Sequence, residues 1–165
     1  MHRTCIAVVD ATRARLFIFG RRAEPDGVHE ELSERTDLVN PTRRRTPAQL
    51  FSDTRPGTNR TGGLQYAFDD HRDAHIDAID AEFSREIIAA IERTVRKTAA
   101  QRLILCASPH MLVQLRALGL RRDGLVIDEL PRDYVKLTPP RLHEQLVEDG
   151  LLPASPPRPD LAPPG

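Results

Sequence analysis

The sequence has no tryptophan, only two tyrosines and two cysteines, and no net charge. With aromatic residues at 4% of the chain, it lacks the stacked rings on which single-stranded nucleic acids bind. Lys and Arg together number 24, as do Asp and Glu, so no overall field draws the protein to nucleic acid or to an anionic membrane. Contact with a polyanion therefore requires a local group of basic residues.

Cys5 and Cys106 lie in apolar, strand-like contexts, which favours two buried thiols over a disulfide or a metal pair. The start, MHRTCIAVVD, holds an apolar run too short for a signal peptide or a membrane span. We therefore expect a cytoplasmic protein without membrane contact. The sequence contains no G-x-G-x-x-G, P-loop or G-x-S-x-G motif, so it shows no nucleotide-binding or hydrolase signature. We expect no metal and no small-molecule cofactor.

The length of 165 residues and the hydrophobic content of 39% predict one α/β domain with a sizeable core. We place this domain at residues 1–150. The stretch 151–165 is rich in proline and cannot pack, so we expect a disordered tail there.

Apolar runs and alternation predict five strands, at residues 4–10, 15–19, 28–32, 102–107 and 125–129. A long amphipathic helix is predicted from about Asp73 by apolar residues every three or four positions, namely Ile76, Ile79, Phe83, Ile87, Ile91 and Val95. Two shorter helices should begin at Ser108–Pro109 and Thr138–Pro139, where a cap residue precedes proline.

The order β-β-β-α-β-α-β-α predicts a mixed five-stranded sheet of the RNase H-like type, with the first strand central and helices packed on it. The first three strands, joined by short turns, should pair antiparallel. Each later strand is reached through a helix and should lie parallel.

Residues 40–72 show no period and are rich in turn formers, so they predict a long loop that is either functional or disordered. The charges between 40 and 63 are Asp53 against five arginines: Arg43, Arg44, Arg45, Arg55 and Arg60. These arginines could neutralise RNA phosphates or contact a protein partner. The alternative is a solvated loop whose arginines pair with the acidic start of the long helix.

Three other groups of polar residues invite a chemical interpretation. His71 and His75 share a helix face as metal ligands do, but the acidic residues around them also match the helix dipole. Asp10 with Glu82 or Glu86 could hold metal in a nuclease, although Asp10 is more simply a turn residue. Ser108 beside His110 is better explained as a helix cap than as a nucleophile.

Several motifs appear in order along the chain, at residues 8–17 (VVDATRARLF), 37–41 (DLVNP), 52–58 (SDTRPGT), 103–112 (LILCASPHML) and 130–139 (LPRDYVKLTP). Together they resemble the bacterial host attachment protein family, whose members are described as required for attachment to host cells. The resemblance covers about residues 4–149.

That family is similar to the middle domain of archaeal and eukaryotic class-1 peptide release factors, which carry a Gly-Gly-Gln loop between the third strand and the long helix. Here Gly62, Gly63 and Gln65 stand at that point, with Leu64 inserted. The resemblance implies a binding module that recognises RNA, the ribosome, tRNA or a protein partner through the 40–72 loop. It also leaves open a peptidyl-tRNA hydrolase acting through Gly62, Gly63 and Gln65.

Overall fold

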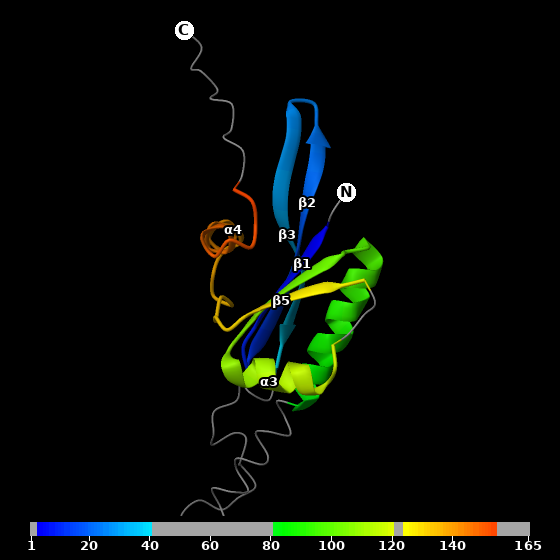
Figure 1. Cartoon of the computed structure of the whole chain (residues 1–165), viewed down its shortest axis with the longest axis vertical. Helices are drawn as coiled ribbons and strands as arrows, with labels where there is room; N and C mark the ends of the chain where they lie inside the picture. Colours follow the sequence, from blue (N-terminus) through cyan, green and yellow to red (C-terminus); the bar gives the residue numbers. More distant parts are fainter. Residues whose placement is uncertain (1–2, 41–80, 121–123, 155–165) are drawn as a thin grey trace, which may run out of the picture.

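The structure of the protein is a computed structural model that describes residues 3–40, 81–120 and 124–154. Its centre is strand β1 (Thr4–Val9), whose six residues are all buried. This strand lies in the middle of a five-stranded sheet with the order β3-β2-β1-β4-β5 (Figure 1). An uninterrupted apolar strand suits this place because neighbours flank both of its edges and helices cover both of its faces.

The sheet is mixed, as predicted from the order of elements. Strand β2 (Arg13–Glu24) pairs antiparallel with β1, and β3 (Gly27–Val39) pairs antiparallel with β2. Strand β4 (Arg102–Ala107) lies parallel to β1, and β5 (Val126–Leu130) lies parallel to β4. The predicted α/β class and the central first strand are therefore confirmed, while the RNase H-like type remains a prediction.

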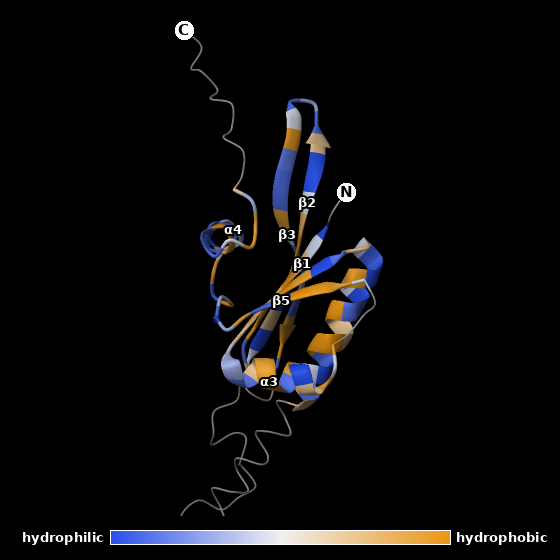
Figure 2. Ribbon diagram, viewed as in Figure 1, coloured by the Kyte–Doolittle hydropathy of each residue, from blue (hydrophilic) through white to orange (hydrophobic). Residues whose placement is uncertain are grey.

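Helices cover the two faces of the sheet, and two apolar clusters fill the space between the layers. Residues 81–98 are helical, and this helix shares one cluster with α3 (Pro109–Ala117) through side chains such as Cys5, Ile87 and Leu115. Helix α4 (Pro139–Glu148) closes the other face over Ile6 and Val8. Figure 2 shows the hydrophobic colour concentrated on the central strands and on the inner sides of the helices.

The apolar stripe of the long helix is confirmed over the part that the structure describes. Phe83, Ile87, Ile91 and Val95 are all buried. The expected start near Asp73, with Ile76 and Ile79, lies outside the described residues. The pair of cysteines is also confirmed, since Cys5 and Cys106 are free and buried.

Strands β2 and β3 are much longer than the predicted strands at 15–19 and 28–32, so those bounds were wrong. Pairing of β1 with β2 ends at Thr4 and Phe19, whereas β2 and β3 stay paired as far as Glu24 and Gly27. Residues 20–31 therefore form a two-stranded ribbon that projects beyond the sheet (Figure 1). Polar side chains dominate this ribbon (Figure 2), so the apolar pattern that marks a strand is absent there.

The last described residues stay in contact with the domain. Leu152 is buried in the cluster under α4, and the carbonyl of Leu151 accepts a 2.6 Å hydrogen bond from Nη1 of Arg102. The tail predicted at 151–165 lies mostly outside the described residues, and its disorder remains a prediction.

Candidate functional site

The carboxyl ends of β1 and β4 form the candidate site. These strands are parallel and in register, with Val9 opposite Ala107, so the residues that follow them, Asp10 and Ser108, leave the same edge of the sheet. Ligands of open α/β sheets bind at such an edge. The third strand returns to this edge as well, because Val39 pairs with Arg13.

Asp10 organises the turn between β1 and β2. Its Oδ1 accepts hydrogen bonds from the backbone N–H groups of Thr12 and Arg13, both at 2.7 Å, and from the Thr12 hydroxyl at 2.8 Å. A carboxylate that bonds to the backbone two and three residues ahead stabilises a tight turn. The turn role predicted for Asp10 is thus confirmed.

Asn40 fastens the end of β3 to this turn. Its backbone N–H donates to the carbonyl of Thr12 at 2.8 Å, and its side-chain Nδ2 donates to the carbonyl of Ala11 at 3.2 Å. Asn40 is only 3% exposed. The end of β3 is therefore fixed to the turn that follows β1. The sequence contained the D-L-V-N-P motif but no sign of this contact.

Ser108 caps helix α3, as predicted. Its hydroxyl accepts a 3.4 Å hydrogen bond from the N–H of Met111, and Pro109 occupies the first helical position. Nε2 of His110 lies 3.1 Å from Nε2 of Gln114. The hydroxyl of Ser108 thus acts as a helix cap, the role that the sequence predicts for it.

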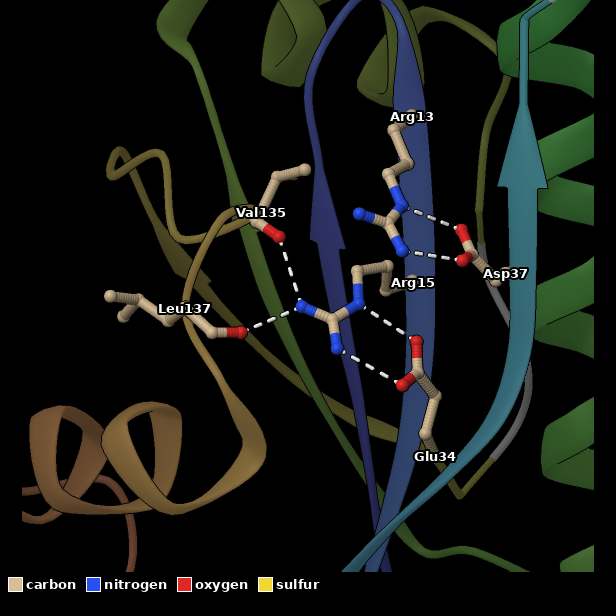
Figure 3. A network of polar contacts seen from close by, with 6 residues as sticks. All are labelled: Arg13, Arg15, Glu34, Asp37, Val135 and Leu137. Carbon is tan, nitrogen blue, oxygen red and sulfur yellow. Dashed lines mark hydrogen bonds and ion pairs between the residues drawn. The ribbon is translucent and has the colours of Figure 1, made fainter.

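Next to this edge of the sheet, two arginines of β2 form ion pairs with carboxylates of β3 (Figure 3). Arg15 makes a two-pronged pair with Glu34, at 2.7 Å from Nε and 3.0 Å from Nη2. Its Nη1 also donates to the carbonyls of Val135 and Leu137, at 3.0 and 2.6 Å. Arg15 therefore fixes the segment between β5 and α4 against the hairpin.

Arg13, two residues before Arg15 on β2, forms a second two-pronged ion pair with Asp37 on β3. The distances are 2.8 and 2.5 Å, and the hydrogen bond to Asp37 raises the pKa of the guanidinium above its ordinary value. Both side chains are 40% exposed, so this pair is much more solvated than the pair made by Arg15.

At the tip of the projecting ribbon, Glu24, Asp26 and His29 bring one ligand atom each within 4.8 Å of one another. A hydrogen bond from His29 at 2.9 Å lowers the pKa of the Asp26 carboxyl. Contacts within the group account for its closeness, because His29 Nε2 also lies 3.7 Å from Glu24. Within the described ranges no such cluster joins Asp10 to Glu82 or Glu86, and the nuclease interpretation gains no support.

The predicted site residues lie outside the described residues. These are Gly62, Gly63 and Gln65 of the proposed catalytic loop, the arginines Arg43, Arg44, Arg45, Arg55 and Arg60, and the histidines His71 and His75. Their roles remain predictions. None of the helices that the structure describes is long and apolar enough to cross a membrane.

The fold and the edge define a class: α/β proteins with a mixed five-stranded sheet and a polar turn region from which residues 41–80 depart. The model of the family described as "Protein required for attachment to host cells" matches residues 5–146. The chain belongs to this family, as its motifs suggested. The relationship to peptide release factors remains a prediction.

Known structures and curated proteins add little to this assignment. A structure of the Aquifex aeolicus PPX-GPPA enzyme aligns over 78% of this chain with 12% identity and a TM-score of 0.38. The aligned part is 36% of that enzyme's chain, so this protein spans roughly a third of its length. No curated protein matches the sequence.

Proposed function

We propose that this member of the host attachment family is a non-enzymatic binding module that recognises RNA or the ribosome through residues 40–72. The observation that carries the proposal is the anchoring of Asn40 to the turn at Ala11 and Thr12. Asn40 is buried and makes two hydrogen bonds to this turn. It would therefore hold the start of the segment in place while a partner binds. The described polar groups at this edge, Asp10 and Ser108, are engaged in internal hydrogen bonds, which favours binding over catalysis.

The charge of the segment supports an anionic partner. The five arginines between 40 and 63 stand against a single acidic residue, Asp53. Each arginine that neutralises a phosphate releases counterions, so affinity for RNA should fall steeply as salt rises. A protein partner with an acidic surface is the alternative ligand for the same residues.

The test is a ribosome co-sedimentation and RNA filter-binding assay at several salt concentrations. We expect the variant R43A/R44A/R45A to bind more weakly and to reduce the slope of log affinity against log salt by about two to three. The matched control R93A/R96A/K97A removes three positive charges from exposed residues of the 81–98 helix and should bind like the wild type. Equal binding by both variants would contradict the proposal.

The second candidate function is a peptidyl-tRNA hydrolase that acts through Gly62, Gly63 and Gln65. It is favoured by the position of these residues, between the third strand and the long helix, as in release factors. The assay measures release from peptidyl-tRNA and from ribosome–nascent-chain complexes. Loss of release in Gln65→Ala, but not in the control Gln49→Ala from the same segment, would establish catalysis and displace the binding-only proposal.

The proposal also puts the protein in the cytoplasm, where RNA and ribosomes are found. Cell fractionation followed by immunoblotting tests this directly. Recovery of the protein mainly at the cell surface would favour a direct adhesion role instead.

A further inference from the structure

A cleft of about 470 Å³ lies at the base of the projecting ribbon. Figure 1 shows the start of β1 and the end of the 81–98 helix close to this base. Nη1 of Arg3, the residue before β1, donates a 3.3 Å hydrogen bond to the carbonyl of Thr98. The Arg3 side chain also lies against Gly20, because a Cβ on this glycine would stand 3.8 Å from Cγ of Arg3. The ribbon and the start of β1 thus form one surface.

Arginines supply most of the charge of this cleft. Four arginines and two glutamates line it: Arg3, Arg21, Arg22, Arg35, Glu31 and Glu34. Successive residues of a strand point to opposite faces of the sheet. Arg21 and Glu34 point to the face under α4, where they pair with Glu30 at 3.1 Å and with Arg15 at 2.7 Å. Three arginines and one carboxylate therefore remain in the cleft, which gives it a local excess of positive charge.

The three remaining arginines are exposed and keep most of their donors available. The guanidinium of Arg22 lies 3.6 Å from Glu24, and 69% of its side chain is exposed. Arg3 and Arg35 are exposed as well, and neither forms an ion pair with a carboxylate of the residues that the structure describes. An anion that enters the cleft would therefore meet guanidinium groups without displacing a close ion pair.

The residue types of the cleft favour phosphate as its ligand. A guanidinium group presents N–H donors in a planar fork that matches two oxygens of a phosphate. Ile18, the large apolar side chain of the lining, is only 4% exposed, so the cleft offers little apolar contact to a bilayer or to an apolar peptide. A surface of exposed arginines around a polar hollow suits the backbone of a nucleic acid.

We propose that this arginine cleft, formed by Arg3, Arg22 and Arg35, binds phosphate groups of an RNA backbone. The inference rests on the proposed function for the identity of the partner and adds a second contact surface to residues 40–72. The two surfaces lie at opposite ends of β1, because Arg3 precedes this strand and Asn40 bonds to the turn that follows it. A strand of six residues spans about 20 Å, so one RNA molecule can reach both surfaces.

The probe for the first experiment is a fluorescein-labelled oligouridylate of about twelve nucleotides, whose affinity for the full chain is measured by anisotropy at several salt concentrations. We expect R22A/R35A to bind about fivefold more weakly and to lower the slope of log affinity against log salt by about one to two. The matched control R132A/R141A removes two charges from exposed positions beside and on α4 and should bind like the wild type. Circular dichroism checks that each variant is folded.

A charge change of the opposite kind makes the test independent of any loss of structure. Glu31→Gln removes the carboxylate that remains among the three arginines. We expect it to bind the oligouridylate about twofold to threefold more tightly than the wild type at low salt, because the local positive charge rises. Unchanged affinity in both Glu31→Gln and R22A/R35A would overturn the proposal.

The variant R43A/R44A/R45A separates this inference from the proposed function. If R22A/R35A binds like the wild type while R43A/R44A/R45A binds weakly, the cleft does not bind RNA and the proposed function stands. Weak binding by R22A/R35A alone supports the cleft and contradicts recognition through residues 40–72. No binding of RNA by the wild type overturns both proposals.

The second experiment locates the contact. An oligouridylate that contains thiouridine is photocrosslinked to the full chain, and the crosslinked peptides are identified by mass spectrometry. We expect crosslinks within residues 20–35 that R22A/R35A loses, and crosslinks confined to other parts of the chain would overturn the proposal. An oligoglutamate of equal charge serves as the competing ligand. If it binds more tightly than the RNA and loses affinity in R22A/R35A, the cleft belongs to an acidic protein segment instead.

Discussion

Arg15 and Glu34 join the second and third strands through two hydrogen bonds, and the same guanidinium holds the backbone between β5 and α4 (Figure 3). The Arg15 side chain is 8% exposed and also lies 4.9 Å over the ring of Phe17. One side chain therefore links three separate parts of the chain. Its loss would leave Glu34 without its partner and two carbonyls without a donor.

We predict that Arg15→Ala lowers the free energy of unfolding by about 3 kcal/mol, because it removes one partner of a largely buried pair. Arg15→Lys should recover only part of this loss, since an ammonium group cannot reproduce the fork geometry. Arg13→Ala is the matched control and should cost under about 1 kcal/mol, because its pair with Asp37 is solvated. Urea denaturation measures all three. Equal losses at Arg15 and Arg13 would contradict this explanation.

We predict that Asp10 stabilises the turn and takes no direct part in partner binding or catalysis. Asp10→Ala removes the acceptor of three hydrogen bonds and should destabilise the fold by about 1–2 kcal/mol. Asp10→Asn retains an oxygen acceptor and should lose less than half of that. Partner binding by Asp10→Asn should match the wild type; a large defect in a well-folded Asp10→Asn protein would assign the carboxylate a direct role.

The two caps offer a paired comparison. Ser108 accepts a hydrogen bond from the start of α3, whereas Thr138 makes no side-chain hydrogen bond at the start of α4. Ser108→Ala should therefore lower the free energy of unfolding by about 0.5–1 kcal/mol, and Thr138→Ala should lower it by only about 0.2 kcal/mol. Thermal unfolding of the two variants provides the measurement. The reverse order would show that the hydroxyl of Ser108 does not act as a cap.

Ala99 ends the 81–98 helix in a left-handed conformation, with a φ of 53°. Glycine is the usual residue there because a Cβ is strained in this region. Ala99→Gly should thus stabilise the protein by about 0.5–1 kcal/mol. The control Ala89→Gly lies at an exposed position in the interior of the same helix and should destabilise the protein by a similar amount. If Ala99→Gly does not stabilise the protein, the Ala99 conformation is unstrained.

The buried thiols make stability depend on alkaline pH. Burial raises the pKa of both Cys5 and Cys106 from 9.0 to about 12. Unfolded thiols ionise from about pH 9 while the folded ones stay protonated, so the unfolded chain binds fewer protons and stability falls between about pH 9 and 12. Below pH 9 this contribution is fully present.

The measurement is urea denaturation at a series of pH values. In the double variant C5A/C106A the free energy of unfolding should decline less steeply above pH 9. Some decline should remain, because burial and the hydrogen bond to Asp149 also raise the pKa of Tyr134, to about 12. Native protein should also resist alkylation at pH 8. An identical alkaline slope in the double variant would contradict the assignment.

The sequence predicted those parts of the fold that have a local signal. The stripe of Phe83, Ile87 and Ile91 marks a buried helix face, and the Ser-Pro pair at 108–109 marks a helix start. The central strand was predictable because every residue of Thr4–Val9 except Thr4 is apolar. Each of these features is decided by residues close together in the chain.

The sequence did not predict the features that depend on distant partners. The projecting ribbon of residues 20–31 has no buried face and therefore no apolar pattern. Arg15 is charged and stands in a strand, yet it is buried because carbonyls more than a hundred residues away accept its hydrogen bonds. Asn40 was visible as part of a motif, but its contact with the Asp10 turn required the fold. The proposed site residues of 40–72 remain predictions.

The central place of β1 has a consequence for the synthesis of the protein. Its edge toward β2 is satisfied as soon as the hairpin has left the ribosome, but its other edge belongs to Arg102–Ala107. At about 5–20 residues per second, translation takes roughly 5–20 seconds to supply that strand. During this interval the nascent chain exposes the unpaired, apolar edge of β1. A chaperone that prevents aggregation of the nascent chain would have to cover this edge.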